Sequence, residues 1–338
     1  MTIIAEPTAT EEQIAEIIAR VEASGLEARI NRDELRVTVA VIGANESLAE
    51  ASFSEMPGVE AVIPGTTAYR LASFAARGKA SIVEICGVSV GRDSAVALIC
   101  GPCSVESREQ ILSIAHFVKD AGARILRGGA FKPRTSPYSF QGLREEGLRF
   151  LAEARNETGM PVITEVMDAR DLPTVERYAD CLQIGARNMH NFSLLKEVGR
   201  SHLPVLLKRG FSATIDELIM SAEYILSAGN PNVLLCERGI RTFETATRYT
   251  LDLSAVPILK AKTHLPVVVD PTHGVGLRAF VPQMSLAAVA AGADAIMLEV
   301  HDSPHAAKSD GEQALLPETL GKLLPRLRAV ANAIGRDL

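Results

Sequence analysis

AVALICG, residues 95–101, is the first of eight short apolar runs that decide the fold. The other seven follow it along the chain: RILRGGA (124–130), PVITEV (161–166), CLQIGA (181–186), PVLLKR (204–209), NVLLCER (232–238), LPVVVDP (265–271) and AIMLEV (295–300). These runs are apolar without alternation, which is typical of strands in a parallel sheet that is buried on both faces. Successive runs start about 20–37 residues apart, the step of a strand followed by a helix.

Eight strand–helix units of this kind predict an α/β fold in which the sheet closes into a (β/α)8 TIM barrel over residues 95–338. The alternative is an open, doubly wound sheet. Such a sheet usually carries a glycine-rich dinucleotide-binding turn after its first strand, and GPCSVES (101–107) is not a turn of that type. We therefore expect the closed barrel.

Residues 1–70 show a different pattern, in which short strands and helices alternate in the order βαββαβ. Strands are expected over 1–6, 27–32, 35–43 and 59–65, with a turn at Asn31–Glu34, and helices over 8–25 and 46–56. Thr8 or Thr10 would cap the first helix. This order predicts a small ferredoxin-like domain over residues 1–70. Residues 71–94 are expected to form a connector, with a short hairpin ahead of the barrel.

Composition and charge exclude several classes of protein. The net charge is −6, and residues 1–70 alone carry −7, so the chain has no basic surface for general nucleic-acid binding. No stretch approaches the roughly 18 apolar residues of a membrane span, and the first twenty residues do not read as a secretory signal. Five cysteines in 338 residues do not make a disulfide framework. We therefore expect a cytoplasmic protein that binds neither nucleic acid nor membrane.

Charged residues follow the apolar runs at the end that becomes the active face of a barrel. A strand that leaves the core often ends in a polar residue, and a single cation there is often a surface salt bridge, but neither reading explains the whole set. Arginine and lysine bind phosphate and carboxylate groups. The set predicts two small, strongly anionic substrates, at least one of them phosphorylated. Its six cations are Arg127, Lys132, Arg134, Arg187, Lys208 and Arg238.

A second set combines one thiol, one imidazole and two carboxylates. Cys103, His273 and Glu299 follow the first, seventh and eighth runs, and Asp310 lies in the next loop. Such donors suit a divalent metal such as Mn, Fe, Co or Zn. The alternative is a core histidine with unrelated surface acids. Cys100 and Cys103 also form a C-x-x-C pair, but we favour Cys103 as a ligand.

The remaining cysteines give a simpler expectation. Cys86, Cys181 and Cys236 should be buried apolar residues, because free cysteine behaves as a small hydrophobic side chain.

Seven segments of the chain resemble 3-deoxy-D-arabino-heptulosonate 7-phosphate (DAHP) synthase, in the type I-beta form that carries an N-terminal ferredoxin-like domain. The longest is RGGAFKPRTSPYSFQG (127–142), and the others are GPCSVES (101–107), QIGARNMHNFSLL (183–195), PVLLKRGF (204–211), LCERGIRTFE (235–244), DPTHGVG (270–276) and EVHDSPHAAKSDGEQAL (299–315). The resemblance covers the barrel, and more loosely residues 1–70. It implies that phosphoenolpyruvate condenses with erythrose 4-phosphate and water to give DAHP and phosphate, the first step of aromatic amino-acid biosynthesis.

The resemblance also implies roles for single residues. Cys103, His273, Glu299 and Asp310 would hold the metal, and Lys132, Cys103 and His273 would be catalytic, with Lys132 or a metal-bound water as the proton donor. Arg127, Lys132, Arg187, Lys208 and Arg238 would surround phosphoenolpyruvate, while Pro133, Arg134, Thr135 and Ser136 would bind erythrose 4-phosphate.

Two further expectations follow from the resemblance. The family forms homotetramers, and its N-terminal domain binds tyrosine or phenylalanine as a feedback effector, although a plain oligomerisation domain is an alternative here. A rival family, 3-deoxy-manno-octulosonate 8-phosphate synthase, typically reads K-A-N-R-S-S where this chain has KPRTSP (132–137). A catalytically silent barrel that senses an amino acid is the other alternative. It would have lost a ligand or a cation, and none is lost.

Overall fold

The structure is a computed structural model that describes residues 1–32, 37–42, 51–63, 69–132, 136 and 138–338. Internal contacts divide the chain into two compact units. One comprises Met1–Ala80 with Ala261–His264, and the other comprises Ser81–Lys260 with Leu265–Leu338. The division falls at Ala80–Ser81, inside the segment expected as a connector (71–94). No helix among the described residues has both the length and the apolar character to cross a membrane.

The first unit is a four-stranded antiparallel sheet with the order β2-β3-β1-β4. Its elements are β1 (Thr2–Ala5), α1 (Glu11–Ala23), β2 (Glu27–Arg32), β3 (Val37–Ile42), α2 (Ala51–Ser54), β4 (Val59–Ile63) and α3 (Phe74–Arg77). The predicted ferredoxin-like order is confirmed. Thr10, rather than Thr8, caps α1. Parts of the expected turn at 31–34 and of the expected helix at 46–56 lie outside the described residues.

An apolar core between α1 and the sheet holds this unit together. Ile14, Ile17 and Val21 recur along one face of α1, at the spacing that a helix requires. Ile17 and Val21 pack with Ile3 of β1 and Val39 and Val41 of β3. The sheet and helix therefore bury one continuous hydrophobic layer, and the charged residues of α1 stay on its outer face.

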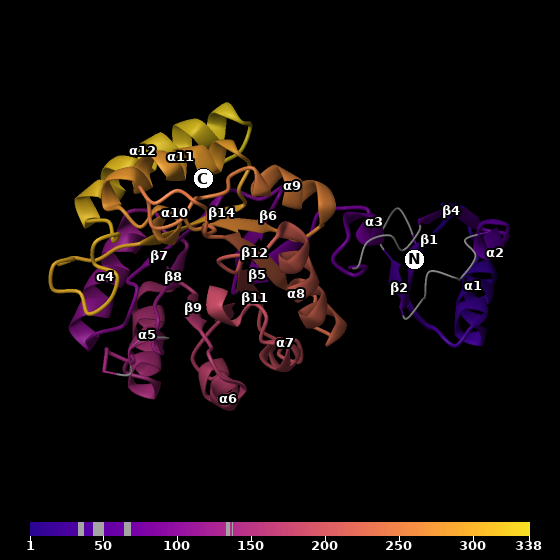
Figure 1. Ribbon diagram of the computed structural model, residues 1–338, viewed down its shortest axis with the longest axis horizontal. Coiled ribbons are helices and arrows are strands. Elements are labelled where there is room, and N and C mark those ends of the chain that lie inside the picture. Colours follow the sequence, from indigo (N-terminus) through magenta and orange to yellow (C-terminus); the bar gives the residue numbers. More distant parts are fainter. Residues whose placement is uncertain (33–36, 43–50, 64–68, 133–135, 137) are drawn as a thin grey trace. The chain divides into compact units, whose positions relative to one another are not determined.

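The second unit is the predicted closed barrel of eight parallel strands, and each of the eight apolar runs contains one of them (Figure 1). The strands are β7 (Ala97–Gly101), β8 (Ile125–Arg127), β9 (Val162–Glu165), β10 (Cys181–Ile184), β11 (Val205–Lys208), β12 (Val233–Glu237), β13 (Val267–Val269) and β14 (Ala295–Glu299). Each pairs with its neighbours in sequence, and β14 closes the barrel on β7, where Glu299 lies beside Gly101.

Helices surround the barrel (Figure 1). They are α4 (Arg108–Asp120), α5 (Glu145–Thr158), α6 (Leu172–Glu176), α7 (Phe192–Val198), α8 (Ile215–Ser227), α9 (Ala255–Lys262), α10 (Pro271–Val275), α11 (Val281–Ala290) and α12 (Pro317–Ala333). Neighbouring helices such as α4 and α5 contact each other around the ring. This arrangement covers the outer face of every strand, which explains why the strands are apolar on both faces.

A hairpin of β5 (Ile82–Ile85) and β6 (Val88–Gly91) precedes the barrel. Its buried residues share one apolar core with interior residues such as Ala97, Cys181 and Ala295, which begin their strands. The core therefore fills the barrel from the end where the strands begin. The polar strand ends are left at the opposite mouth.

The prediction for Cys86 was wrong, because this residue is exposed, whereas Cys181 and Cys236 are buried as expected. Cys86 and Gly87 form the two-residue turn between β5 and β6, and both have positive φ angles of 42° and 84°. This geometry is that of tight hairpin turns. The Cys86 thiol donates a hydrogen bond to Oδ1 of Asp180 at 3.4 Å.

Candidate active site

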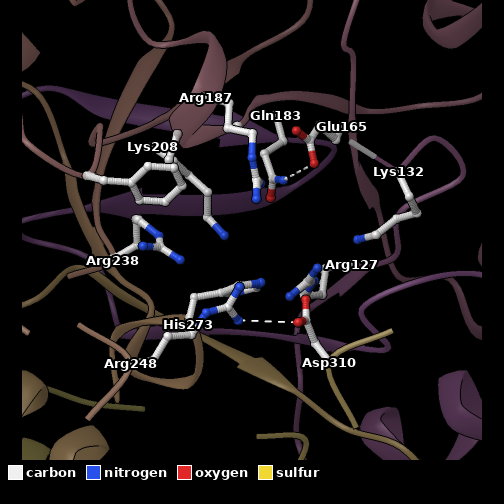
Figure 2. Close-up of a pocket in the computed structure, with 13 residues that line it drawn as sticks. Arg127, Lys132, Glu165, Gln183, Arg187, Lys208, Arg238, Arg248, His273 and Asp310 are labelled. Atoms are coloured by element: carbon white, nitrogen blue, oxygen red, sulfur yellow. Dashed lines mark hydrogen bonds and ion pairs between the residues drawn. The ribbon is translucent and has the colours of Figure 1, made fainter. Parts of the chain in front are cut away.

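A strongly charged cavity lies at the mouth where the barrel strands end. Figure 2 shows the side chains of Arg127, Arg187, Lys208 and Arg238 pointing into it from different strands and loops. Its full lining is Arg127, Lys132, Glu165, Gln183, Gly185, Ala186, Arg187, Lys208, Phe211, Arg238, Arg248, His273 and Asp310. The predicted cluster of cations therefore exists at the barrel mouth, as far as the structure describes its members.

Two glycines allow the strands to come together at this mouth. A side chain at Gly101 would place its Cβ 2.0 Å from the carbonyl oxygen of Arg127, and the φ angle there is +154°. A Cβ at Gly185 would lie 2.1 Å from Oε1 of Glu165. Any larger residue would push apart the strand ends that carry the polar groups.

The four predicted ligands form one compact group. Donor atoms of Cys103, His273, Glu299 and Asp310 all lie within 4.8 Å of one another. The thiol of Cys103 is 3.2 Å from Oδ2 of Asp310, and Nε2 of His273 is 3.1 Å from Oε1 of Glu299. One sulfur, one nitrogen and two carboxylate oxygens at this spacing fit a single divalent cation.

Two cations border the ligand group from the cavity side. Lys132 Nζ donates to the carbonyl oxygen of Cys103 at 2.9 Å and to its sulfur at 3.0 Å. Arg127 Nη1 donates to Oε1 of Glu299 at 2.9 Å, and both side chains are buried. The cavity cations and the ligand group are therefore parts of one site.

Residues that the sequence did not single out as site residues hold these ligands in place. Asp270 Oδ2 accepts from Nδ1 of His273 at 2.7 Å and from Lys208 Nζ at 2.5 Å. Gln313, which is 2% exposed, donates to Oε2 of Glu299 at 2.6 Å. Arg248 then donates both to Gln313 at 2.8 Å and to Asp310 at 3.2 Å.

The charges of the site shift one another's pKa values. Burial alone would lower the pKa of His273, but the carboxylates of Asp270 and Glu299 outweigh burial and raise it to about 10. Burial would raise the pKa of Glu299, but His273 and Arg127 hold it well below its usual range. In the protein without a bound metal, the site is therefore a network of ion pairs.

Some predicted residues take other places. Glu237, which ends β12, is fully buried beside Arg209, with 2.8 Å between Oε2 and Nη1, and does not line the cavity. Ser136 is exposed and is not among the cavity residues. Pro133, Arg134 and Thr135, expected on the erythrose-phosphate side, lie outside the described residues.

Closed barrel, cationic cavity and compact ligand group together define a (β/α)8-barrel enzyme for small anionic substrates. The chain belongs to the DAHP synthetase I family, whose description matches residues 71–334, and the DAHP synthase ferredoxin-like domain matches residues 1–65. This finding confirms the family and the two-part fold predicted from the sequence.

Individual relatives agree with this assignment. The chain is 45% identical over 335 residues to a phospho-2-dehydro-3-deoxyheptonate aldolase of Thermotoga maritima, and the alignment covers 99% of each chain. A crystal structure of a DAHP synthase from Thermotoga maritima superposes with a TM-score of 0.80 at 44% identity, covering 99% of this chain and 98% of that one. The predicted enzyme class, a 3-deoxy-7-phosphoheptulonate synthase, is confirmed.

The rival family is also related, but at a greater distance. A 2-dehydro-3-deoxyphosphooctonate aldolase of Syntrophobacter fumaroxidans is 34% identical over 272 residues, which cover 75% of this chain and 93% of the relative. Its similarity is lower and spans less of the chain than that of the Thermotoga enzyme. The DAHP synthase family is in general metal-dependent, and the described residues contain one group that could hold a metal ion.

Proposed function

We propose that this enzyme condenses phosphoenolpyruvate with D-erythrose 4-phosphate and water, and releases DAHP and inorganic phosphate, as the first step of the shikimate pathway. The observation that carries the proposal is the cationic cavity directly beside the Cys–His–Glu–Asp group. Two phosphorylated substrates repel each other in water. A cavity lined by arginine and lysine offsets that repulsion and holds the reacting carbons together.

Phosphoenolpyruvate would bind among Arg127, Lys132, Arg187, Lys208 and Arg238, which line the cavity. Arg127 Nε is buried and has no hydrogen-bond partner among the described residues. A buried donor of this kind is costly unless it is paired. An oxygen of the substrate phosphate or carboxylate would supply the missing partner.

Erythrose 4-phosphate would bind on the side of Pro133, Arg134, Thr135 and Ser136. Support for this placement comes from the KPRTSP sequence (132–137). The segment begins at Lys132, whose Nζ contacts Cys103, so it leaves the site next to the proposed metal ligands.

A divalent metal (Mn, Fe, Co or Zn) held by Cys103, His273, Glu299 and Asp310 would supply a Lewis acid that polarises the aldehyde carbonyl. Lys132 places a positive charge beside the Cys103 sulfur, with 3.0 Å between Nζ and Sγ. Arg127 fixes the Glu299 carboxylate from the opposite side.

Lys132 is also our candidate for the proton donor. Burial would lower its pKa, but the neighbouring Cys103 and Glu165 raise it, so the side chain stays protonated. Lys132 lines the cavity and therefore stands where a new alkoxide must be neutralised.

The direct test mixes the full chain with phosphoenolpyruvate, erythrose 4-phosphate and Mn²⁺ and follows the fall in enol absorbance. We expect turnover that a chelator abolishes. Arabinose 5-phosphate in place of erythrose 4-phosphate is the matched control, and turnover with arabinose 5-phosphate alone would assign the chain to the rival reaction. No turnover with either sugar would favour the silent barrel.

For the first unit we propose a regulatory role in a cytoplasmic homotetramer. Its ferredoxin-like fold is the family's N-terminal domain, and an aromatic amino acid, tyrosine or phenylalanine, is the proposed effector. A truncated DAHP synthase of Thermotoga maritima has a solved structure that covers 79% of this chain at a TM-score of 0.74, so a barrel without this unit is a practical reagent.

Inhibition by tyrosine, phenylalanine and tryptophan should be measured before and after deletion of residues 1–70. We expect one of the first two to inhibit the full chain and not the truncated one. Light scattering of both proteins checks the tetramer. Equal inhibition of the two proteins would remove the regulatory role, and an inert but oligomeric domain would leave only assembly as its function.

A further inference from the structure

Lys132 lies against the Cys103 sulfur, and the other cations of the site fall into two groups that differ in how they are neutralised. The first group pairs with carboxylates: Arg127 with Glu299, Lys208 with Asp270, Arg209 with Glu237 and Asp252, and Arg248 with Asp310. The second group is Arg187 and Arg238. Among the described residues, no carboxylate oxygen lies within 4.0 Å of either guanidinium. A second mechanism must therefore hold these two.

That mechanism is a stacked pair of aromatic rings. Phe211, which follows β11, and Tyr249, in the loop after β12, have ring centroids 5.1 Å apart and an interplanar angle of 3°. Arg238 Cζ lies 4.3 Å from the centroid of Tyr249 and 4.9 Å from that of Phe211. Arg187 Cζ lies 5.5 Å from the ring centroid of Phe211. Both arginines are thus held against rings.

This contact leaves the arginine charge available. A ring attracts a guanidinium through its face, without accepting from the N–H groups in the way that a carboxylate does. Arg238 is 3% exposed, and within the described part of the chain its side chain donates one long hydrogen bond, of 3.5 Å, to the carbonyl oxygen of Gly239. Figure 2 shows Arg187 and Arg238 directed into the cavity. Their donors therefore face the space where a substrate anion would sit.

The backbone is built to place the two rings. The amide of Arg241 donates to the carbonyl oxygen of Phe211 at 2.6 Å, which joins the loops after β11 and β12. Gly239 has a φ angle of +88°, and a Cβ there would lie 2.8 Å from the Cβ of Tyr249. The close packing of Tyr249 against the backbone therefore depends on glycine at position 239.

We propose that Phe211 and Tyr249 are positioning residues, which hold Arg238, and Phe211 also Arg187, with unneutralised charge for a phosphate or carboxylate group of the substrate. This inference rests on the proposed function, since it assumes an anionic substrate in the cavity. The rings act through the arginines. Their loss should therefore weaken substrate affinity more than it slows turnover of the bound complex.

The test compares Tyr249→Leu and Phe211→Leu with the conservative Tyr249→Phe and Phe211→Tyr. For each Leu variant we expect KM for phosphoenolpyruvate to rise roughly 5- to 30-fold, with kcat within about threefold of the wild type. The conservative variants should stay close to the wild type. Unchanged KM in both Leu variants, or a loss of kcat at unchanged KM, would overturn the proposal.

A double-mutant comparison shows whether the rings act through Arg238. Tyr249→Leu should raise KM for phosphoenolpyruvate by a clearly smaller factor in an Arg238→Ala background than in the wild type. Equal cost in both backgrounds would refute the link. Circular dichroism and melting temperature of each variant identify any that fail to fold, and the remaining ring variant then carries the test.

Calorimetric titration with inorganic phosphate makes the test independent of turnover. The Leu variants should bind phosphate several-fold more weakly than the wild type, and equal binding would contradict the proposal. A wild-type protein that binds phosphate but turns over neither sugar would refute the proposed function alone. An active wild type with unaffected variants would refute only the role of the rings.

Discussion

The two units of the chain differ most in what they bury. Among the described residues of the first unit, no Asp, Glu, Lys or Arg side chain is buried, and its core is aliphatic and aromatic. The barrel buries charged residues of both signs, among them Arg127, Lys208, Asp270 and Glu299. Buried charge is unfavourable for stability unless each group is paired. Most of these buried charges gather at the end of the barrel where the strands end, which indicates a site that serves chemistry.

Removal of a ligand should give the largest effect. We expect His273→Ala and Cys103→Ala to lower kcat/KM by more than about 10³-fold and to lose bound metal, with the fold retained. Activity assays and metal analysis of the purified variants check this. Cys86→Ala is the matched control, since Cys86 is exposed and absent from the ligand group. Full activity in a metal-free His273→Ala protein would refute the metal role.

The next largest effect is expected at His264 of the first unit. This residue lies in the segment Ala261–His264, which belongs to that unit, and is 5% exposed. Burial disfavours the charged ring and lowers the pKa of His264 to about 4. Below about pH 6.5 the unfolded chain takes up a proton that the folded unit does not. The free energy of unfolding should therefore decrease as the pH is lowered, and at pH 4 it should be about 3 kcal/mol lower than at neutral pH.

Urea unfolding of the full chain between pH 7 and pH 4 measures this dependence. His264→Gln should flatten the curve relative to the wild type, because a neutral side chain has no proton to bind. His202→Gln, at an exposed position, is the control and should leave the curve unchanged. An identical pH dependence in the wild type and in His264→Gln would show that His264 is not the group responsible.

In the barrel, a substitution of Asp270 tests whether the buried ion pairs support metal binding. Its carboxylate holds both His273 and Lys208. Because such partners orient a ligating histidine, Asp270→Asn should weaken metal affinity about 10- to 100-fold. Competition with a chelator measures it. Asp294→Asn removes another buried carboxylate, which pairs with Lys260 and Arg336, and should leave metal affinity unchanged.

The sequence predicted what strand periodicity determines. The barrel and the places of Arg127, Lys208 and His273 follow from apolar runs that end in polar residues. Gln313, Arg248 and Phe211 were missed because they lie in loops, where position depends on contacts between loops rather than on a repeating pattern. Arg248, for example, is placed by a hydrogen bond from its backbone amide to the carbonyl oxygen of Val275, the last residue of α10.

Cys86 is a further case in which the sequence pattern did not predict the position of a side chain. Residue type favoured burial, but the tight turn between β5 and β6 places its side chain in solvent. For the ligand group, the sequence offered the four donors, and only the closed barrel brings them within 4.8 Å of one another. Closure of a sheet depends on contacts between residues far apart in sequence, which local patterns do not contain.

The smallest expected effect tests how far the first unit is separate from catalysis. Thr10 Oγ1 accepts from the amide of Gln13 at 3.3 Å, and the Gln13 side chain accepts from the amide of Thr10 at 2.8 Å. Loss of such a cap costs about 1 kcal/mol, so Thr10→Ala should lower the stability of the first unit by that amount. Hydrogen exchange along α1 measures it.

Thr8→Ala is the matched control, because Thr8 is exposed two residues earlier and does not cap α1. It should change stability by less than about 0.5 kcal/mol. Neither variant should change kcat/KM, since neither threonine lines the cavity. A fall in kcat/KM for Thr10→Ala alone would show that the order of α1 is coupled to catalysis. The first unit would then contribute to catalysis even though it has no buried charged residues among its described positions.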